Sequence, residues 1–217
     1  MKAYRIGVLP GDGIGEEVLR EGMRVVSALS QKFGFRYEAI HYPFGAEHFL
    51  ETGEIIPDPA FAEMKTLDAI FLGAIGDPRI ETGKLERGIV GRLRWELDLY
   101  VNLRPVRLYA EHLCPLKDKK PEDLDILVVR ENTEGIYLGI GGFMRKGTEH
   151  EIATQETIYT RRGVERIIRY AFDACRKRNK KRKITLVDKA NAIGAHDLWR
   201  RTFAEVAKEY PDLTTEA

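Results

Sequence analysis

Cysteine is rare in this sequence. The 217 residues contain only Cys114 and Cys175, far apart in the chain, with no Cys-x-x-Cys pair and no histidine beside them at ligand spacing. This excludes the usual zinc-ligand pattern and a disulfide framework. We expect two buried free thiols, because cysteine is among the residues most often found in protein interiors.

Long apolar runs are also missing. The run IGVL at residues 6–9 ends at Pro10, far short of the core of a signal peptide. The stretch AIFLGAIG at residues 69–76 is too short to span a bilayer. We therefore expect no membrane association, and a cytoplasmic location is the default.

The sequence has no excess of one charge either. Lysine and arginine number 35 against 34 aspartates and glutamates, so the whole chain does not attract nucleic acid or an anionic membrane. One local run, RKRNKKRK at residues 176–183, is basic. A nucleic-acid patch there is the alternative to a solvated helix end, which we favour because the run lacks aromatic residues and closes a predicted helix.

Strand-like and helix-like patterns do alternate in the first part of the chain. Short apolar strands are expected at residues 5–9, 35–40 and 69–73, with helical spacing between them. The apolar face of the first helix is expected to consist of Val18, Gly22, Val25, Val26 and Leu29. Two β-α-β steps in succession predict an α/β fold with a parallel sheet and helices on its faces.

The later elements are less regular. We expect a helix at 84–100, an extended segment at 101–109, a strand at 125–132, a protruding arm at about 139–160, a strand at 184–188 and a last helix around 199–210. Pro105 excludes a helix interior in the extended segment. Thr160 is the expected N-cap of another periodic helix, because its hydroxyl can accept a bond from a free backbone N–H.

A glycine-rich turn, GDGIG, follows the first predicted strand. A dinucleotide fingerprint needs its third glycine one residue after Gly15, where the chain has Glu16. A Walker loop is also excluded, since no Gly-Lys-Ser/Thr follows. Phosphate binding and a tight strand-to-helix turn both remain open, and we favour the turn because glycine tolerates a positive φ.

Three arginines lie near the ends of predicted elements. Arg94 is on the helix at 84–100, Arg104 is in the extended segment, and Arg130 ends the strand at 125–132. Each guanidinium matches a carboxylate bidentately, so together they could bind a substrate with two carboxylates. Taken singly, each fits a surface ion pair better, and only the three together favour a substrate site.

Groups able to move protons follow two of the strands. Tyr137 comes soon after Arg130, and Lys189 with Asn191 follows the strand at 184–188. A lysine of lowered pKa can take a proton from a hydroxyl, and a tyrosine can deliver one to carbon. The alternative for Lys189 is a solvated loop residue.

Five motifs occur in a fixed order: GDGIGEEV, LGAIGDP, LRWELDLYVNLRP, VRENTEGIYLG and VDKANAI. In this order and at these separations the chain resembles the β-decarboxylating 2-hydroxyacid dehydrogenases, and the resemblance covers essentially all 217 residues. It implies an isopropylmalate-dehydrogenase-like α/β fold, three-layer α/β/α and not a Rossmann fold, incomplete at the C-terminus.

The resemblance also implies a reaction and roles for residues. An NAD-dependent enzyme of this family oxidises the hydroxyl of a malate-type acid and then releases the β-carboxylate as carbon dioxide. Arg94, Arg104 and Arg130 would bind the substrate carboxylates. Lys189 would be the general base, and Tyr137 would protonate the enolate carbon. A Mg²⁺ or Mn²⁺ ion would act as Lewis acid. Cofactor contacts are expected at Ile14, Ala74 and Asn191.

The same resemblance implies a homodimer with shared active sites. The small domain would carry an interlocking arm at about 139–160, and Lys189 and Asn191 would reach the active site of the partner subunit. We expect residues 1–100 to form the N-terminal part of the large cofactor-binding domain and residues 101–217 to form the small domain for substrate binding and dimerisation.

Substrate choice in the family depends on side chains three, four and seven residues before the first arginine: here Gly91, Val90 and Arg87. Val90 with Gly91 makes a small apolar wall that suits an isopropyl group, so (2R,3S)-3-isopropylmalate, the substrate of leucine biosynthesis, is expected first. Arg87 departs from the acidic residue of typical isopropylmalate enzymes. ENTEG, at residues 131–135, points instead toward tartrate or D-malate and homoisocitrate or isocitrate.

The metal-binding aspartates of the family would follow Ala217, so we expect no metal ligand within this chain. The 217 residues alone are then expected to be inactive. A truncated fragment that can dimerise but not catalyse is the alternative to a piece of a longer enzyme.

Overall fold

The computed structural model describes residues 3–217. Contacts within the chain divide it into two compact units, unit 1 at Met1–Leu97 and unit 2 at Asp98–Ala217. Each is described by itself. Among residues 3–217 there is no helix both long and apolar enough to cross a membrane.

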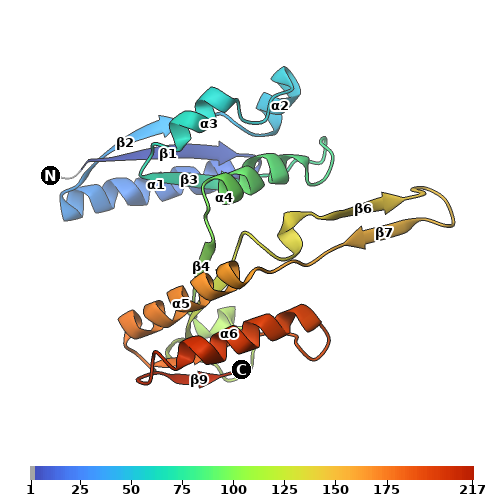
Figure 1. The fold of residues 1–217 in the computed structure, drawn as a ribbon. Coiled ribbons are helices and arrows are strands. Elements are labelled where there is room, and N and C mark those ends of the chain that lie inside the picture. Colours follow the sequence, from blue (N-terminus) through green and yellow to red (C-terminus); the bar gives the residue numbers. More distant parts are fainter. Residues whose placement is uncertain (1–2) are drawn as a thin grey trace. The chain divides into compact units, whose positions relative to one another are not determined.

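Unit 1 is built on the parallel sheet that the sequence predicts. Its strands are β1 (Ala3–Gly11), β2 (Arg36–His41) and β3 (Ala69–Ala74), in the order β2-β1-β3. Both neighbours of β1 run parallel to it, so the ends that carry the following loops lie at the same edge (Figure 1). In an open α/β sheet this carboxyl edge is where ligands bind.

Helices cover both faces of this sheet. The helix α1 (Ile14–Phe33) packs on one face, where an added Cβ at Gly22 would lie 2.5 Å from the ring of Phe71. On the other face a buried core joins the sheet to α3 (Asp58–Met64) and α4 (Arg92–Glu96), while α2 (Ala46–Thr52) follows β2. Leu9, Phe61 and Ile89 are among its most buried members. Unit 1 therefore has three layers, as the α/β/α expectation requires.

The prediction of which α1 residues form the covered apolar face is correct only in part. Gly22 and Val26 are partly covered, but the side chains of Val18, Val25 and Leu29 stay exposed by 55%, 58% and 41%. The most buried α1 residues are Gly15 and Leu19. The face of the helix that contacts the three-stranded sheet is narrower than its apolar stripe, so part of the stripe stays exposed.

Unit 2 begins with a two-stranded antiparallel sheet of β4 (Val101–Arg107) and β5 (Asp125–Glu131). The expected arm is present as the antiparallel pair β6 (Gly141–Met144) and β7 (Ile152–Gln155), which projects from the rest of the unit (Figure 1). The expected strand at 184–188 is shorter: β8 (Lys183–Thr185) pairs in parallel with β9 (Thr214–Glu216). Short 3-10 turns lie at Glu111–Leu113, Pro121–Asp123, Ile136–Leu138 and Gly194–His196.

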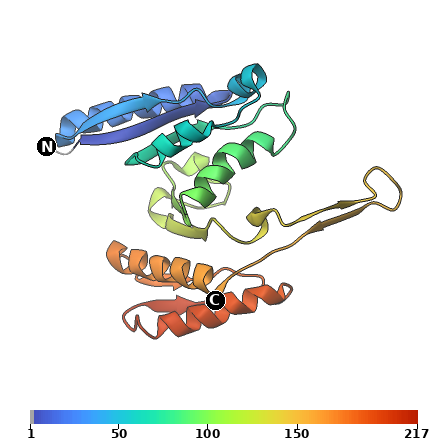
Figure 2. The same ribbon diagram turned by 45° about the horizontal axis from the view of Figure 1, so that its top comes forward.

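The core of unit 2 lies between two helices, α5 (Arg161–Arg178) and α6 (Asp197–Ala207), which run side by side (Figure 2). Phe172 contacts both Phe203 and Tyr210, with ring centroids 5.2 and 4.8 Å apart. The predicted cap is confirmed: the Thr160 hydroxyl accepts a hydrogen bond from the N–H of Gly163 at 3.0 Å. Burial of this apolar seam and the cap together fix where α5 begins.

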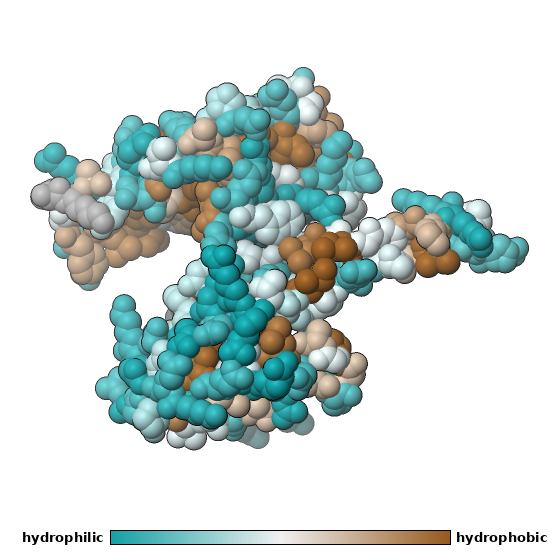
Figure 3. Space-filling model, viewed as in Figure 1, coloured by the Kyte–Doolittle hydropathy of each residue, from teal (hydrophilic) through white to brown (hydrophobic). Residues whose placement is uncertain are grey.

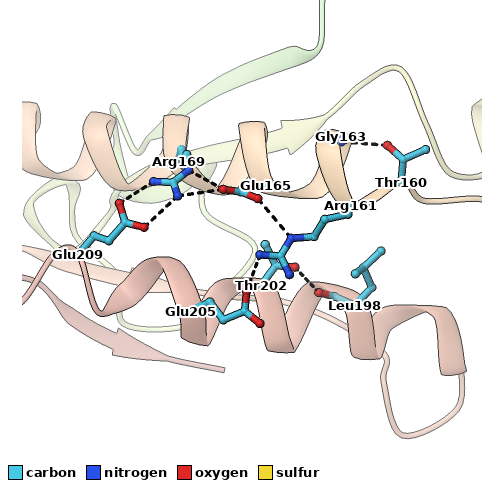
Figure 4. Close-up of polar contacts among 9 residues, drawn as sticks. All are labelled: Thr160, Arg161, Gly163, Glu165, Arg169, Leu198, Thr202, Glu205 and Glu209. Carbon is cyan, nitrogen blue, oxygen red and sulfur yellow. Dashed lines mark hydrogen bonds and ion pairs between the residues drawn. The ribbon is translucent and has the colours of Figure 1, made fainter.

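A ladder of ion pairs runs along the outer side of the two helices. Glu165 accepts from Arg161 and Arg169 on its own helix, and these arginines also reach Glu205 and Glu209 (Figure 4). The ladder alternates in sign along α5, so each charge has an opposite neighbour. It therefore ties the exposed edge of α5 to α6 and the turn after it.

The basic run at residues 176–183 is largely paired inside the unit. Arg176 and Arg182 bind Asp212, while Arg178 and Lys180 bind Asp125. With Lys183 paired to Glu216, five of the seven cationic side chains of the run have a carboxylate partner within the unit, which favours the helix-end interpretation. Both cysteines are free, and each is half-buried where full burial was expected.

Candidate active site

Two of the predicted arginines lie on the same face of the β4–β5 sheet. Asn102 is directly opposite Arg130, and Arg104 is two residues further along β4. Side chains two residues apart in a strand point the same way, so Arg104 and Arg130 are diagonal neighbours. The Nε of Arg104 donates to the Asn102 side chain at 2.9 Å. Asn102 in turn donates to Asn132 at 3.2 Å, which holds this polar row in place.

Tyr137 joins this face. It lies in the 3-10 turn Ile136–Leu138 that follows β5, and its side chain is 39% exposed. The guanidinium carbon of Arg130 is 4.5 Å from the centre of the Tyr137 ring. This is a cation–π contact, favourable by about 0.5–1 kcal/mol at an exposed site. Arg104, Arg130 and Tyr137 are therefore brought together within unit 2.

The surface beside Tyr137 is apolar. Figure 3 shows hydrophobic residues gathered where the arm leaves the unit and again on the arm itself. Ile136 and Ile140 at the base of the arm are 51% and 43% exposed, and Phe143 and Met144 in β6 are each 61% exposed.

The ENTEG loop between Arg130 and Tyr137 is held by its own carboxylates. The buried carboxylate of Glu131 accepts from the N–H and hydroxyl of Thr133 and from the N–H of Glu134 at 2.6–3.0 Å. The Glu134 carboxylate accepts from the N–H and hydroxyl of Thr160 at 2.9 and 2.6 Å. Both glutamates thus fasten the loop to itself and to the start of α5.

The close packing at Gly163 and the pKa of Tyr159 both reflect this arrangement. A Cβ at Gly163 would lie 2.3 Å from the Glu134 carboxylate, so glycine gives that carboxylate room over the first turn of α5. Burial, followed by the charges of Glu131 and Glu134, raises the pKa of Tyr159. The ENTEG side chains therefore hold the loop in shape, so this motif is a weaker indicator of which substrate the protein binds.

Lys189 and Asn191 lie in the exposed turn after β8. Sequence reasoning missed the residue that holds this turn, His196. Its Nδ1 accepts from the N–H of Lys189 at 2.9 Å, and its Nε2 is 3.4 Å from the Tyr159 hydroxyl. An Nδ1 that accepts leaves the proton on Nε2 in the neutral ring, so Nε2 donates to Tyr159. The only hint in the sequence is a histidine seven residues after Lys189.

In unit 1, Arg94 lies on α4, directly after a π-helical segment at Glu86–Gly91. Leu85, Ile89 and Leu93 are buried to 2%, 0% and 5% exposure, so the core face repeats every four residues. Glu86, Val90 and Arg94 each directly follow one of these buried residues, so they form a neighbouring row that is also spaced by four residues. An i→i+5 turn is wider than an α-turn, so side chains four residues apart stay close to one face of the helix.

Val90 and Glu86 therefore lie in the same row as Arg94, at intervals of four residues. The roles expected of Val90, Gly91 and Arg87 from the resemblance stay predictions. Gly91 belongs to the next row, where an added Cβ would lie 2.8 Å from the ring of Trp95, and it is covered by that ring.

A hollow that the sequence did not predict lies beside Glu86. It is lined by Gly76, Asp77, Pro78, Ile80, Glu81, Thr82, Leu85 and Glu86. At its rim Arg79 binds Asp77, with Nε 2.9 Å from Oδ1, and lowers the pKa of that carboxyl to about 2. The hollow follows β3, at the carboxyl edge of the sheet.

The expected cofactor contacts Ile14 and Ala74 are at the same edge. Ile14 begins α1 and is 71% exposed, while Ala74 ends β3 and is half-buried. Gly15 lies against backbone, since an added Cβ would be 2.2 Å from the carbonyl oxygen of Pro10. The glycines of GDGIG thus allow a tight strand-to-helix turn, as favoured from the sequence.

A divalent metal needs several oxygen or nitrogen ligands in one place. Across residues 3–217, histidine, cysteine, aspartate and glutamate do not gather in a group of three or more that could hold an ion. The described residues therefore offer no metal site of their own.

The chain is similar to known proteins over nearly its whole length. The 3-isopropylmalate dehydrogenase of Thermobifida fusca is 49% identical over 216 residues, 99% of this chain and 61% of that protein. The enzyme of the same name from Frankia casuarinae is 49% identical over 213 residues, 98% of this chain and 60% of that protein. The chain thus spans about three fifths of the length of these curated relatives.

Solved structures give the same fold. Isocitrate dehydrogenase from Methylococcus capsulatus matches with a TM-score of 0.83 and 33% identity, covering 98% of this chain and 59% of that one. A β-decarboxylating dehydrogenase from Thermococcus kodakarensis matches with a TM-score of 0.70 and 33% identity, covering 99% and 57%. The family model described as isocitrate/isopropylmalate dehydrogenase matches residues 5–217, and the chain belongs to that family.

Proposed function

We propose that the complete protein containing this chain catalyses the NAD-dependent oxidative decarboxylation of a malate-type 2-hydroxyacid, with (2R,3S)-3-isopropylmalate as the preferred substrate. The observation that carries the proposal is the cluster of Arg104, Arg130 and Tyr137 on one face of unit 2. It offers two carboxylate-binding forks beside a proton donor. The relatives named 3-isopropylmalate dehydrogenase support the choice of substrate.

In the proposed reaction, Arg104 and Arg130 bind a substrate carboxylate, and Arg94 binds a second. Lys189 in its neutral form takes the hydroxyl proton while the carbon loses a hydride. The β-carboxylate then leaves as carbon dioxide, and its bonding electrons form an enolate. Tyr137 gives its proton to the enolate carbon, which completes the product.

The substituent of the substrate is selected in unit 1. Val90 supplies an apolar contact in the row of Arg94, while the Glu86 carboxylate in the same row repels an additional carboxylate. An isopropyl substituent fits both features, whereas isocitrate and homoisocitrate would bring a third negative charge toward Glu86.

A nicotinamide dinucleotide would accept the hydride when bound. The exposed apolar side chain of Ile14 at the carboxyl edge suits contact with one of its rings, and Ala74 and Asn191 are the further proposed contacts. No described set of ligands fits the Mg²⁺ or Mn²⁺ that the family resemblance implies, so no step here depends on a metal held by these residues.

We also propose a homodimer in which the arm of one protomer packs against the other. The exposed Phe143 and Met144 on β6 supply apolar surface for such packing. Lys189 and Asn191 would then serve the active site of the second protomer.

The experiment measures NADH and carbon dioxide formed by the complete protein from 3-isopropylmalate with NAD⁺ and Mg²⁺. We expect equal amounts of both products. Arg130→Lys should raise KM for the acid at least tenfold, because lysine has neither the planar fork nor the same stacking on Tyr137. Arg107→Lys, on the same sheet but paired with Asp125, is the matched control and should stay within twofold.

The alternative is a fragment that only dimerises. The 217-residue chain assayed alone should form no NADH. Turnover by that chain would exclude the fragment alternative, and no turnover by the complete protein with any 2-hydroxyacid would refute the proposed function.

A further inference from the structure

Asp12, the second residue of the GDGIG turn, contacts two other segments at the carboxyl edge of the sheet β2-β1-β3. Its Oδ1 accepts from the N–H of Ala46 at 2.6 Å, and its Oδ2 accepts from the N–H of Gly76 at 2.9 Å. Its own N–H donates to the carbonyl oxygen of Ala74 at 2.6 Å. One residue therefore links the segments that follow β1, β2 and β3.

The backbone around Asp12 is shaped for these contacts. Gly11 has φ 72°, a left-handed conformation that favours glycine and turns the chain directly before Asp12. An added Cβ at Gly45 would lie 2.6 Å from Oδ1 of Asp12, so glycine there leaves room for the carboxylate. The close approach on both sides shows that the carboxylate position is built into the fold.

A carboxylate matches this position better than an amide. Both partners are backbone donors, and an aspartate offers an acceptor oxygen to each of them. Asparagine would offer one acceptor and point an N–H₂ group at the second donor. The two bonds are also charge-assisted, which strengthens them relative to neutral ones.

Backbone hydrogen bonds also distinguish this glycine-rich turn from a phosphate loop. Phosphate loops bind anions through free backbone N–H groups at the start of a helix. Here the N–H groups of Asp12 and Gly15 already donate to the carbonyl oxygens of Ala74 and Asp12, at 2.6 and 2.9 Å. The edge is fixed before any ligand arrives.

We propose that Asp12 is a positioning residue that holds the turn bearing Ile14 and the loop at residues 74–76 in one fixed arrangement for the dinucleotide. The link that Asp12 makes between these segments, here called the tether, rests on the hydrogen bonds alone. Its role in catalysis rests on the proposed function, since only that function places a dinucleotide at this edge.

The test compares Asp12→Asn with the matched variant Asp68→Asn. Asp68 lies at the opposite edge of the same sheet, where its Oδ2 accepts from the N–H of Arg5 at 2.8 Å. Both variants remove one charge and disturb bonds to backbone N–H groups. A purely structural effect would therefore occur in both, whereas a positioning effect is confined to Asp12.

Two measurements decide the proposal. In the 217-residue chain, hydrogen exchange at the Ala46 and Gly76 amides, followed by NMR, should be at least tenfold faster in D12N and unchanged in D68N. In the complete protein, D12N should raise KM for NAD⁺ at least tenfold and leave KM for the hydroxyacid within twofold, while D68N changes neither. Gly45→Ala displaces the carboxylate without altering its charge, so it should reproduce D12N if that variant folds poorly.

Unchanged exchange in both D12N and G45A would refute the tether. Faster exchange with an unaltered KM for NAD⁺ would reduce Asp12 to a structural role and overturn the positioning proposal. A wild-type protein inactive with every 2-hydroxyacid would refute the proposed function instead, and the exchange rates would still decide the tether.

Discussion

The candidate site consists of side chains that we propose bind a ligand and side chains that hold them in place. Arg130 and Tyr137 belong to the first kind, with their guanidinium and ring stacked 4.5 Å apart. Glu131, Glu134 and His196 belong to the second, since their polar atoms bind backbone and side chains of neighbouring segments. Residues of a sequence motif can thus be needed for the site without contacting a substrate.

Glu86 leads to a prediction about specificity. Its carboxylate lies in the row of Val90 and Arg94, where a third substrate carboxylate would meet a like charge. Glu86→Gln removes the charge and keeps the size. We expect the ratio of kcat/KM for isocitrate to kcat/KM for 3-isopropylmalate to rise at least tenfold in the complete protein.

Glu81→Gln is the control for this variant, because Glu81 lines the same hollow outside the row of Arg94. It should leave the ratio within twofold. An equal change in both variants would show that the general negative charge of the hollow, not the position of Glu86, selects the substrate.

Residue types in the sequence predicted Arg94, Arg104, Arg130, Tyr137 and Lys189 as site residues, and the structure brings Arg104, Arg130 and Tyr137 together within unit 2. Asp12 and His196 escaped prediction because their partners, Ala46, Gly76 and Lys189, become neighbours only through tertiary folding. A polar residue in a turn has many possible local partners, and the sequence does not choose among them.

At the scale of elements, regular apolar patterns were the most reliable guide. The three strands of unit 1 and the helix beginning after Thr160 lie where the spacing predicts them. The π-helical segment Glu86–Gly91 could not be recognised, because α and π turns share similar composition and differ by one residue in hydrogen-bond spacing.

The packing of α5 leads to a prediction about acid stability. Hydrogen bonds and charges from Arg176 and Arg182 lower the pKa of Asp212 from 3.8 to about 2. A depressed pKa means that this carboxylate stabilises the fold above about pH 4 and that the stabilisation is lost as the pH falls through about 2. Asp212→Asn should therefore be less stable than the wild type at neutral pH, with the difference vanishing near pH 2.

Urea unfolding of the 217-residue chain, followed by circular dichroism at several pH values, checks this. The effect should be modest, because Asp212 and its partners are partly exposed and screened by solvent. Asp118→Asn, at an exposed loop position, is the matched control. Parallel pH profiles for the wild type and D212N would contradict the assignment.

At the scale of the whole molecule, the chain forms two compact units and carries the family's fold over about three fifths of the length of its relatives. The order of motifs in the sequence was sufficient to identify that family. The service of Lys189 to the active site of a second protomer stays a proposal, as does the binding of a metal.

The central claim concerns which acid the complete protein oxidises. The most direct measurement compares kcat/KM for 3-isopropylmalate, D-malate, tartrate, isocitrate and homoisocitrate with NAD⁺ and Mg²⁺. We predict the highest value for 3-isopropylmalate, because Val90 favours its apolar substituent and Glu86 opposes a third carboxylate. A preference for isocitrate or homoisocitrate by more than tenfold would contradict the account.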